Sequence, residues 1–254
     1  MTAVSFCLCW LLTMILSGCQ NIDPRSVYTQ AQKKMASLTQ REETTTLELV
    51  IDPEGDKTEY FWNLTARFIQ NKNNPQLEID SQSVFPKEEL RSKTIYSDGM
   101  VYIDDNGETY RAEMEYSMLL TRIYRVYPEM ELSVSQLSDL ESSTSEEGLT
   151  LEFTVSAKTV QSIADFAMDQ LQNFGVANPT DVKTEKAEGK IVVDEDSYIS
   201  LLELTIPCVI LQNSLELKAE LKYRKVLSSP ETKISIDTDS LEKYPQVSMW
   251  DLPW

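Results

Sequence analysis

Few side chains in the sequence are arranged for catalysis. Histidine is absent from all 254 residues, which removes the commonest general base and the commonest metal ligand. Ser240 and Lys243 have the Ser-x-x-Lys spacing of penicillin-recognising enzymes, but the Ser-Asp-Asn and Lys-Thr-Gly motifs that accompany it there are missing. The 41 acidic side chains are too numerous to single out one pair for acid–base chemistry. We therefore predict no catalytic residues and no enzymatic activity.

Two acidic turns are the candidates for a metal site. Residues 104–108 and 194–196 carry several carboxylates each, and carboxylate oxygens are the ligands that Ca²⁺ prefers. An EF-hand loop beginning at Asp104 requires glycine at its sixth position, where this sequence has Thr109. Solvated hairpin turns are the simpler interpretation, so we expect neither a metal nor another cofactor.

The cysteines separate into an N-terminal group and one distant thiol. Cys7 and Cys9 lie in an apolar leader and Cys19 at its end, which leaves Cys208 as the only other cysteine. An intramolecular disulfide is then impossible in the mature chain. Cys208 belongs to an apolar run, which favours a buried structural thiol over a reactive one.

The N-terminus has the features of an export signal. Residues 3–16 are apolar but shorter than the about 20 residues of a membrane-spanning helix, as in the core of a signal peptide. Leu16-Ser17-Gly18-Cys19 follows and resembles the bacterial lipobox, in which diacylglycerol is attached to the cysteine and cleavage makes it the N-terminus. We predict a signal peptide over 1–18, lipidation at Cys19, and a tether over 19–25. Acyl chains would hold the protein to the outer face of the cell membrane, each buried CH₂ contributing about 0.8 kcal/mol.

One feature departs from the signal-peptide pattern. The leader contains neither lysine nor arginine, so Met1 supplies its only positive charge. A translation start further upstream would explain the difference. A buried N-terminal helix is the alternative interpretation of the same apolar stretch.

The charge balance excludes one class of partner. All of the formal net charge of -18 lies after residue 19, with 41 acidic against 23 basic side chains. Such a surface repels phosphate backbones and anionic lipid headgroups, and no cluster of Lys and Arg offsets it. We expect no nucleic acid among the partners.

Hydrophobic periodicity predicts a short helix followed by hairpins in the first half of the mature chain. Apolar residues at helical spacing indicate a helix over 26–38. Alternating patterns indicate strands over 47–51, 60–69 and 77–85, and a hairpin over 95–103 that turns at Ser97-Asp98-Gly99. Asn106 and Gly107 predict a second tight turn, because both tolerate positive φ.

The second half mixes helices with long strands. The pattern predicts helices over 116–127 and 160–174, a shorter helix over 133–140, and a surface loop over 141–148. Strands are predicted over 149–155, 191–193, 198–210 and 215–227, with a last one at Ile234 and Ile236. No linker or repeat divides residues 26–254, so we predict one α+β domain in which helices cover one face of a mostly antiparallel sheet.

Aromatic and apolar side chains on these strands are the candidates for a ligand site. Alternate residues of the strand over 60–69 share one face, and apolar pockets bind largely through such side chains. The candidates are Tyr60, Trp62, Leu64, Phe68, Tyr96 and Tyr102. Ordinary sheet core is the alternative for each of them.

The order of these elements resembles that of the LolA/LppX-like proteins, in particular lipoproteins of that type from Gram-positive bacteria. The resemblance covers about 26–244 and rests on the lipobox, the hairpin over 95–103, the mid-chain helix, and residues 189–194 leading into long strands. It implies a strongly curved antiparallel β-sheet, or half-barrel, covered by two or three helices. In some relatives the enclosed cavity carries a lipid or an acyl chain, whereas others serve as sensors or scaffolds.

Two functions therefore stay open. The first is a membrane-anchored extracytoplasmic module that binds a lipid or another hydrophobic ligand in a cavity lined by the sheet. The second is a ligand-free envelope scaffold or sensor that acts through protein–protein contacts. The two functions predict different interiors for the domain. A carrier needs an apolar space, whereas a scaffold fills that space with its own side chains.

Overall fold

The computed structural model describes residues 23–52, 55, 57–71, 73–126, 130–145, 147–173, 180–228, 234–238 and 240–253. The predicted signal peptide and Cys19 lie outside these ranges, as do Phe174 and Gly175 at the predicted end of a helix. Within the ranges, none of the helices is long and apolar enough to cross a bilayer.

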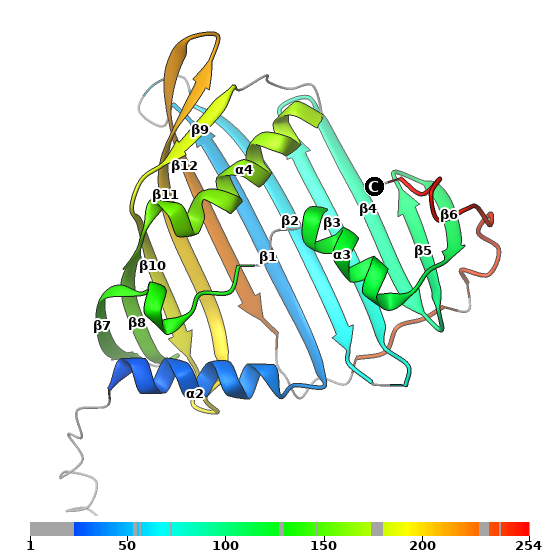
Figure 1. Cartoon of the computed structure of the whole chain (residues 1–254), viewed down its shortest axis with the longest axis horizontal. Coiled ribbons are helices and arrows are strands. Elements are labelled where there is room, and N and C mark those ends of the chain that lie inside the picture. Colours follow the sequence, from blue (N-terminus) through cyan, green and yellow to red (C-terminus); the bar gives the residue numbers. More distant parts are fainter. Residues whose placement is uncertain are drawn as a thin grey trace, which may run out of the picture.

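One large antiparallel sheet organises the described chain (Figure 1). Its first half is a meander in which each strand pairs with the next in sequence. These strands are β1 (Gln40–Ile51), β2 (Thr58–Ile69), β3 (Gln76–Phe85), β4 (Glu88–Ser97), β5 (Met100–Asp105) and β6 (Glu108–Glu113). The turns at Asp98-Gly99 and Asn106-Gly107 have positive φ at both residues, which the sequence predicts for Asn106-Gly107.

The second half extends the same sheet from the other side of β1. Its strands are β7 (Ser138–Ser145), β8 (Gly148–Val155), β9 (Asp181–Thr184), β10 (Ala187–Val193), β11 (Ile199–Gln212) and β12 (Leu215–Leu227). The order across the sheet is β6-β5-β4-β3-β2-β1-β12-β11-β10-β8-β7, and β9 pairs with the other end of β11. The first strand of the sheet therefore pairs with the last, β12, at the middle of the sheet.

The described residues form three α-helices beside the inner face of the sheet, defined as the face that carries Trp62 and Leu64. They are α2 (Pro24–Ala36), α3 (Tyr116–Val126) and α4 (Ala157–Asn173), and a short 3₁₀ helix covers Val134–Gln136. Figure 1 shows α3 and α4 over this face and α2 along the lower ends of the strands. The side chain of Asp23 accepts a hydrogen bond from the backbone N–H of Arg25 and caps α2, whose first turn begins with Pro24. The predicted α+β half-barrel with its helices is confirmed.

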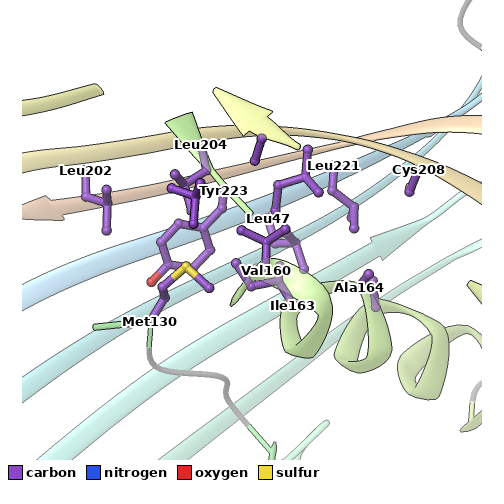
Figure 2. Packing of buried hydrophobic residues seen from close by; sticks show 14 of the residues in the cluster. Leu47, Met130, Val160, Ile163, Ala164, Leu202, Leu204, Cys208, Leu221 and Tyr223 are labelled. Atoms are coloured by element: carbon purple, nitrogen blue, oxygen red, sulfur yellow. The ribbon is translucent and has the colours of Figure 1, made fainter. Parts of the chain in front are cut away.

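Helix α4 is held by one apolar side. Val160, Ile163, Ala164, Ala167 and Leu171 are all fully buried, as the sequence predicts. Figure 2 shows Val160 and Ile163 close to Leu47 and Leu221 of the sheet. Burial of these side chains, at about 25 cal/mol per Å² of apolar surface, attaches the helix to the strands.

The outer face of the sheet is partly covered by the C-terminal segment. Ile234, Ile236 and Leu241 form a buried cluster with Ile95 and Tyr102. The same segment then reaches β6, where the N–H of Arg111 donates to the carbonyl of Pro245 and the N–H of Val247 donates to the carbonyl of Arg111. These bonds protect one edge of the sheet from pairing with another chain.

The structure corrects three predictions of local structure. The expected helix over 133–140 is a single 3₁₀ turn followed by β7, and the expected loop over 141–148 is mostly that strand. β7 is an exposed edge strand without an apolar face, so its sequence lacks the alternation that identifies strands. Ile234 and Ile236 are buried by packing on the outer face but form no strand.

Candidate functional site

Two separate apolar cores lie on the inner face of the one sheet. The first, called the α4 core, packs residues of α4 such as Ile163 and Leu171 against Leu47, Trp62 and Tyr223. The second, called the α3 core, packs Leu119 and Ile123 of α3 against Leu77, Ile79 and Ile103. The two cores rest on neighbouring strands, so the residues between them decide whether the interior is continuous.

A row of small and polar residues crosses the sheet between the cores. Strand register places Lys225 beside Thr45, Thr45 beside Leu64, Leu64 beside Ser81, Ser81 beside Ser92, and Ser92 beside Asp105. This set, called the polar row, contains one apolar side chain, Leu64. Serine and threonine side chains are too short to reach the helices above, which keeps the two cores apart.

A cavity of about 860 Å³ occupies the space over the polar row. Its sheet wall includes Leu47, Trp62, Leu64, Phe68, Ile79 and Leu90. Leu120 and Ile123 of α3 line one side, and Phe166 of α4 lines the other. This volume falls within the range of about 300–1,000 Å³ that is typical of small-molecule sites.

Hydrogen-bond donors gather at the end of the cavity formed by β12, β1 and β2. Trp62, Tyr223, Lys225 and Thr45 all line it there. Trp62 lies opposite Leu47 in the register, and Leu47 lies opposite Tyr223, so the two aromatic residues flank one leucine on the same face. The indole N–H of Trp62 is buried and has no hydrogen-bond partner among the described residues.

A charged trio lies beside these donors. The buried carboxylate of Glu43 contacts Nζ of Lys225 at 3.0 Å and Nε of Arg41 at 3.3 Å. The guanidinium of Arg41 also lies 4.5 Å from the ring centroid of Phe68, in a cation–π arrangement. We call Trp62, Tyr223, Lys225 and Thr45, together with this trio, the donor corner.

Carboxylates lie elsewhere around the cavity. Asp165 and Asp169 of α4 are exposed and line its helical side, and Asp105 lies at the far end of the polar row. Burial raises the pKa of Asp105, with smaller contributions from the nearby Glu108 and Asp104. Both ends of the cavity therefore carry both signs of charge, Glu43 with Lys225 at one end and Asp105 with Arg91 at the other.

The structure brings together three of the six predicted ligand-site residues. Trp62, Leu64 and Phe68 line the cavity. Tyr60 instead packs beside it in the α4 core, 6.3 Å from the ring of Phe85. Tyr96 packs in the α3 core, 5.2 Å from the ring of Tyr116.

Tyr102 lies on the opposite face of the sheet. Its ring packs in the outer-face cluster, 6.4 Å from the ring of Tyr244. The two-residue turn at Asp98-Gly99 pairs Tyr96 with Val101, so Tyr102 faces away from Tyr96. The prediction that Tyr102 shares a site with the other five candidates is therefore corrected, because the register places it on the outer face.

Several cavity residues were not among the sequence-based candidates. Lys225, Glu43, Ser81, Ser92 and Phe166 are distant in sequence, and only the register of the sheet and the position of α4 bring them together. Ser81 and Ser83 could have been identified from the sequence by one pattern. The inner face of β3 reads Leu77, Ile79, Ser81, Ser83, Phe85, an apolar face interrupted at its centre.

The groups considered for chemistry have structural roles or are exposed. Cys208 is 4% exposed within the α4 core, and burial, with smaller effects from Glu185 and Glu220, raises the pKa of its thiol to about 12. Ser240 and Lys243 are exposed. In the hairpin at 104–108, Asp104 accepts a hydrogen bond from the N–H of Gly107. The described residues include no group of three or more acidic or cysteine side chains placed to hold a metal.

Comparisons with known proteins give structural matches only. No family model matches the chain, and no curated protein matches it. A LolA superfamily protein from Nitrosomonas europaea aligns at 8% identity over 87% of this chain and 98% of its own, with a TM-score of 0.23. A putative outer membrane lipoprotein-sorting protein domain from Vibrio parahaemolyticus aligns at 7% identity over 86% and 96%, with a TM-score of 0.24. The ywiB protein from Bacillus subtilis aligns at 10% identity over 78% and 99%, with a TM-score of 0.22.

At these identities and TM-scores we transfer no property of the three proteins to this chain.

Proposed function

We propose that this protein is a membrane-anchored extracytoplasmic lipoprotein that binds a lipid or another hydrophobic ligand in the cavity between α3 and α4. Lipid attached at Cys19 would hold it to the outer face of the membrane. The domain that follows would take up the apolar part of the ligand. No step of this role requires catalysis.

The observation that carries the proposal is the unfilled space between the two cores. A scaffold without a ligand is expected to pack its interior at a density close to that of an organic crystal. Here the α4 core and the α3 core face each other across about 860 Å³, and tryptophan, leucine, isoleucine and phenylalanine side chains form much of the walls. An apolar ligand that enters this space gains the hydrophobic free energy of leaving water and stabilises the folded state by mass action.

The position of the predicted anchor is compatible with this role. Cys19 precedes Asp23, the cap of α2, by four residues, and an extended chain spans at most about 3.6 Å per residue. The start of α2 would then lie within roughly 14 Å of the lipidated cysteine. A domain held this close to the bilayer can exchange an apolar ligand with it over a short distance.

Filling the cavity tests the proposal. Leu64→Trp adds a large ring at the centre of the polar row, whereas Thr65→Trp adds the same ring to the adjacent position, which faces the outer side of the sheet. The neutral dye N-phenyl-1-naphthylamine should bind the purified wild type and the Thr65→Trp variant with similar affinity. Leu64→Trp should weaken binding at least tenfold, with thermal melting as the check that both variants fold.

Native mass spectrometry gives a second measurement. Protein purified without added detergent should retain an apolar molecule that Leu64→Trp no longer carries. If the wild type bound neither the dye nor any membrane lipid, the scaffold role would replace the one proposed here.

A further inference from the structure

We propose that Leu252 and Pro253 form a wall on the α3 side of the cavity and set the longest apolar chain that the cavity admits. This inference rests on the proposed function and specifies which ligands that site accepts. It gives the last described part of the C-terminal segment a role in ligand selection.

The C-terminal segment crosses from the outer face of the sheet to the inner face at the edge formed by β6. Leu241 packs on the outer face, and the hydrogen bonds of Arg111 with Pro245 and Val247 hold the chain beside β6. Leu252 is then buried on the inner face, in the α3 core. Figure 1 shows the last part of this segment, in red, beside β5 and β6. The segment is therefore attached on both sides of the sheet edge.

A turn over residues 248–251 directs the chain into the α3 core. The N–H of Asp251 donates to the carbonyl of Ser248, and the N–H of Trp250 donates to the hydroxyl oxygen of Ser248. Trp250 is 72% exposed, whereas Leu252 is 6% exposed. The turn thus leaves one large side chain in solvent and places a second one, two residues later, in the core.

Pro253 follows Leu252 directly and lines the cavity. Leu120 and Ile123 of α3 line it as well, and Ile123 shares the α3 core with Leu252. Pro253 therefore lies on the α3 side of the cavity. Its ring fixes the backbone angle φ, which makes this part of the wall stiffer than most residue types would.

The burial of Leu252 turns this wall into a limit on chain length. Each CH₂ group that a ligand buries raises its affinity about fourfold, and burial of a leucine side chain contributes about two to four times as much free energy as one CH₂ group. A ligand chain that reaches the wall buries further groups only by displacing Leu252 and Pro253. One or two added CH₂ groups do not compensate for that loss, so the affinity stops rising at this length.

A series of neutral probes that differ only in chain length tests the wall. Saturated 1-monoacylglycerols, from octanoyl to icosanoyl in steps of two carbons, are titrated below their critical micelle concentrations. Each displaces N-phenyl-1-naphthylamine from the purified full-length protein. For the wild type we expect the affinity to rise with chain length, by about fourfold per CH₂ group, and then to stop rising within the series.

Two variants move the limit in opposite directions. A chain that ends after Asp251 lacks Leu252 and Pro253, and its affinity should keep rising for at least two more carbons. Pro253→Trp places a larger ring at the same position, and its limit should be at least two carbons shorter than that of the wild type. Thermal melting checks that both variants fold. Because loss of Leu252 weakens the α3 core, Pro253→Trp decides the test if the shortened chain does not fold.

Trp250→Ala is the matched control, because this residue belongs to the same turn but is exposed. Its ring lies 5.7 Å from the guanidinium of Arg122 and is not part of the cavity wall. The limit of Trp250→Ala should equal that of the wild type. A limit that shifts equally in this control would overturn the assignment to Leu252 and Pro253.

The other outcomes separate this inference from the proposed function. Equal limits in the wild type and the variants would overturn the wall, as would a wild-type affinity that rises through the whole series or dye binding without any binding of monoacylglycerols. Each of these results leaves the cavity able to bind an apolar molecule. Failure of the wild type to bind the dye would instead count against the proposed function.

Discussion

The thiol of Cys208 is a nucleophile shielded from solvent. It lies within the α4 core, and burial raises its pKa from an ordinary value of 9.0 to about 12. Since the thiolate is the reactive form, a native protein at pH 8 should react with a thiol reagent very slowly. With the proposed cleavage and lipidation at Cys19, the chain unfolded in guanidinium should yield one reactive thiol. Rapid labelling of the folded protein would contradict the burial of Cys208.

The same shift predicts how stability depends on pH. The folded state holds the Cys208 proton more tightly than the unfolded state, because the folded pKa is the higher one. This contribution is complete below about pH 9 and is lost as pH rises toward 12. The melting temperature of the wild type should therefore fall more steeply between pH 8 and pH 11 than that of Cys208→Ala. Parallel curves for the two proteins would show that the thiol does not contribute.

Half of the six candidates from the sequence line the cavity. Trp62, Leu64 and Phe68 were found because alternation along one strand fixes a shared face. Tyr102 was misplaced because its face depends on the turn at Asp98-Gly99, which pairs residue 96 with residue 101. Lys225 and Glu43 could not be found in this way, since nothing local indicates that β12 pairs with β1.

At the scale of elements, α4 is the best place to measure how much side-chain packing contributes to the free energy of unfolding. Leu171 is fully buried near the C-terminal end of the helix, in the α4 core. Leu171→Ala should reduce the free energy of unfolding by about 2 to 5 kcal/mol, measured by chemical denaturation. Lys158→Ala, at an exposed position of the same helix, should stay within about 0.5 kcal/mol of the wild type. A loss below about 0.5 kcal/mol for Leu171→Ala would mean that the helix is only loosely attached.

Strong periodicity explains which elements the sequence predicted. β2, β12 and α4 have clear apolar faces, and their predicted extents agree closely with Thr58–Ile69, Leu215–Leu227 and Ala157–Asn173. β7 is almost entirely polar, with Leu140 as its one apolar residue, because it lies at the edge of the sheet and packs little. The cavity depends on which part of the sheet the helices leave uncovered. The sequence of one helix or strand does not determine this.

At the scale of the whole molecule, the proposed lipid anchor would decide where the cavity operates. Cys19→Ala should prevent acylation, so the variant should no longer incorporate a fatty-acid analogue in metabolic labelling and should be released or mislocalised. Cys208→Ala should remain membrane-associated, because that thiol is buried in the domain. Incorporation of label into the Cys19→Ala variant would refute the lipobox interpretation.

The pairing of β1 with β12 also sets the order in which the chain can fold. β1 to β6 can form a meander as soon as they are available, since each strand follows its partner directly. β1 then keeps one open edge, with Leu47, Leu49 and Val50 nearby, until β12 appears near the end of the chain. Contacts between such distant residues form slowly, and an open apolar edge can pair with another copy in the meantime. Slow synthesis of the C-terminal half should therefore promote aggregation more than a substitution that destabilises one of the local hairpins.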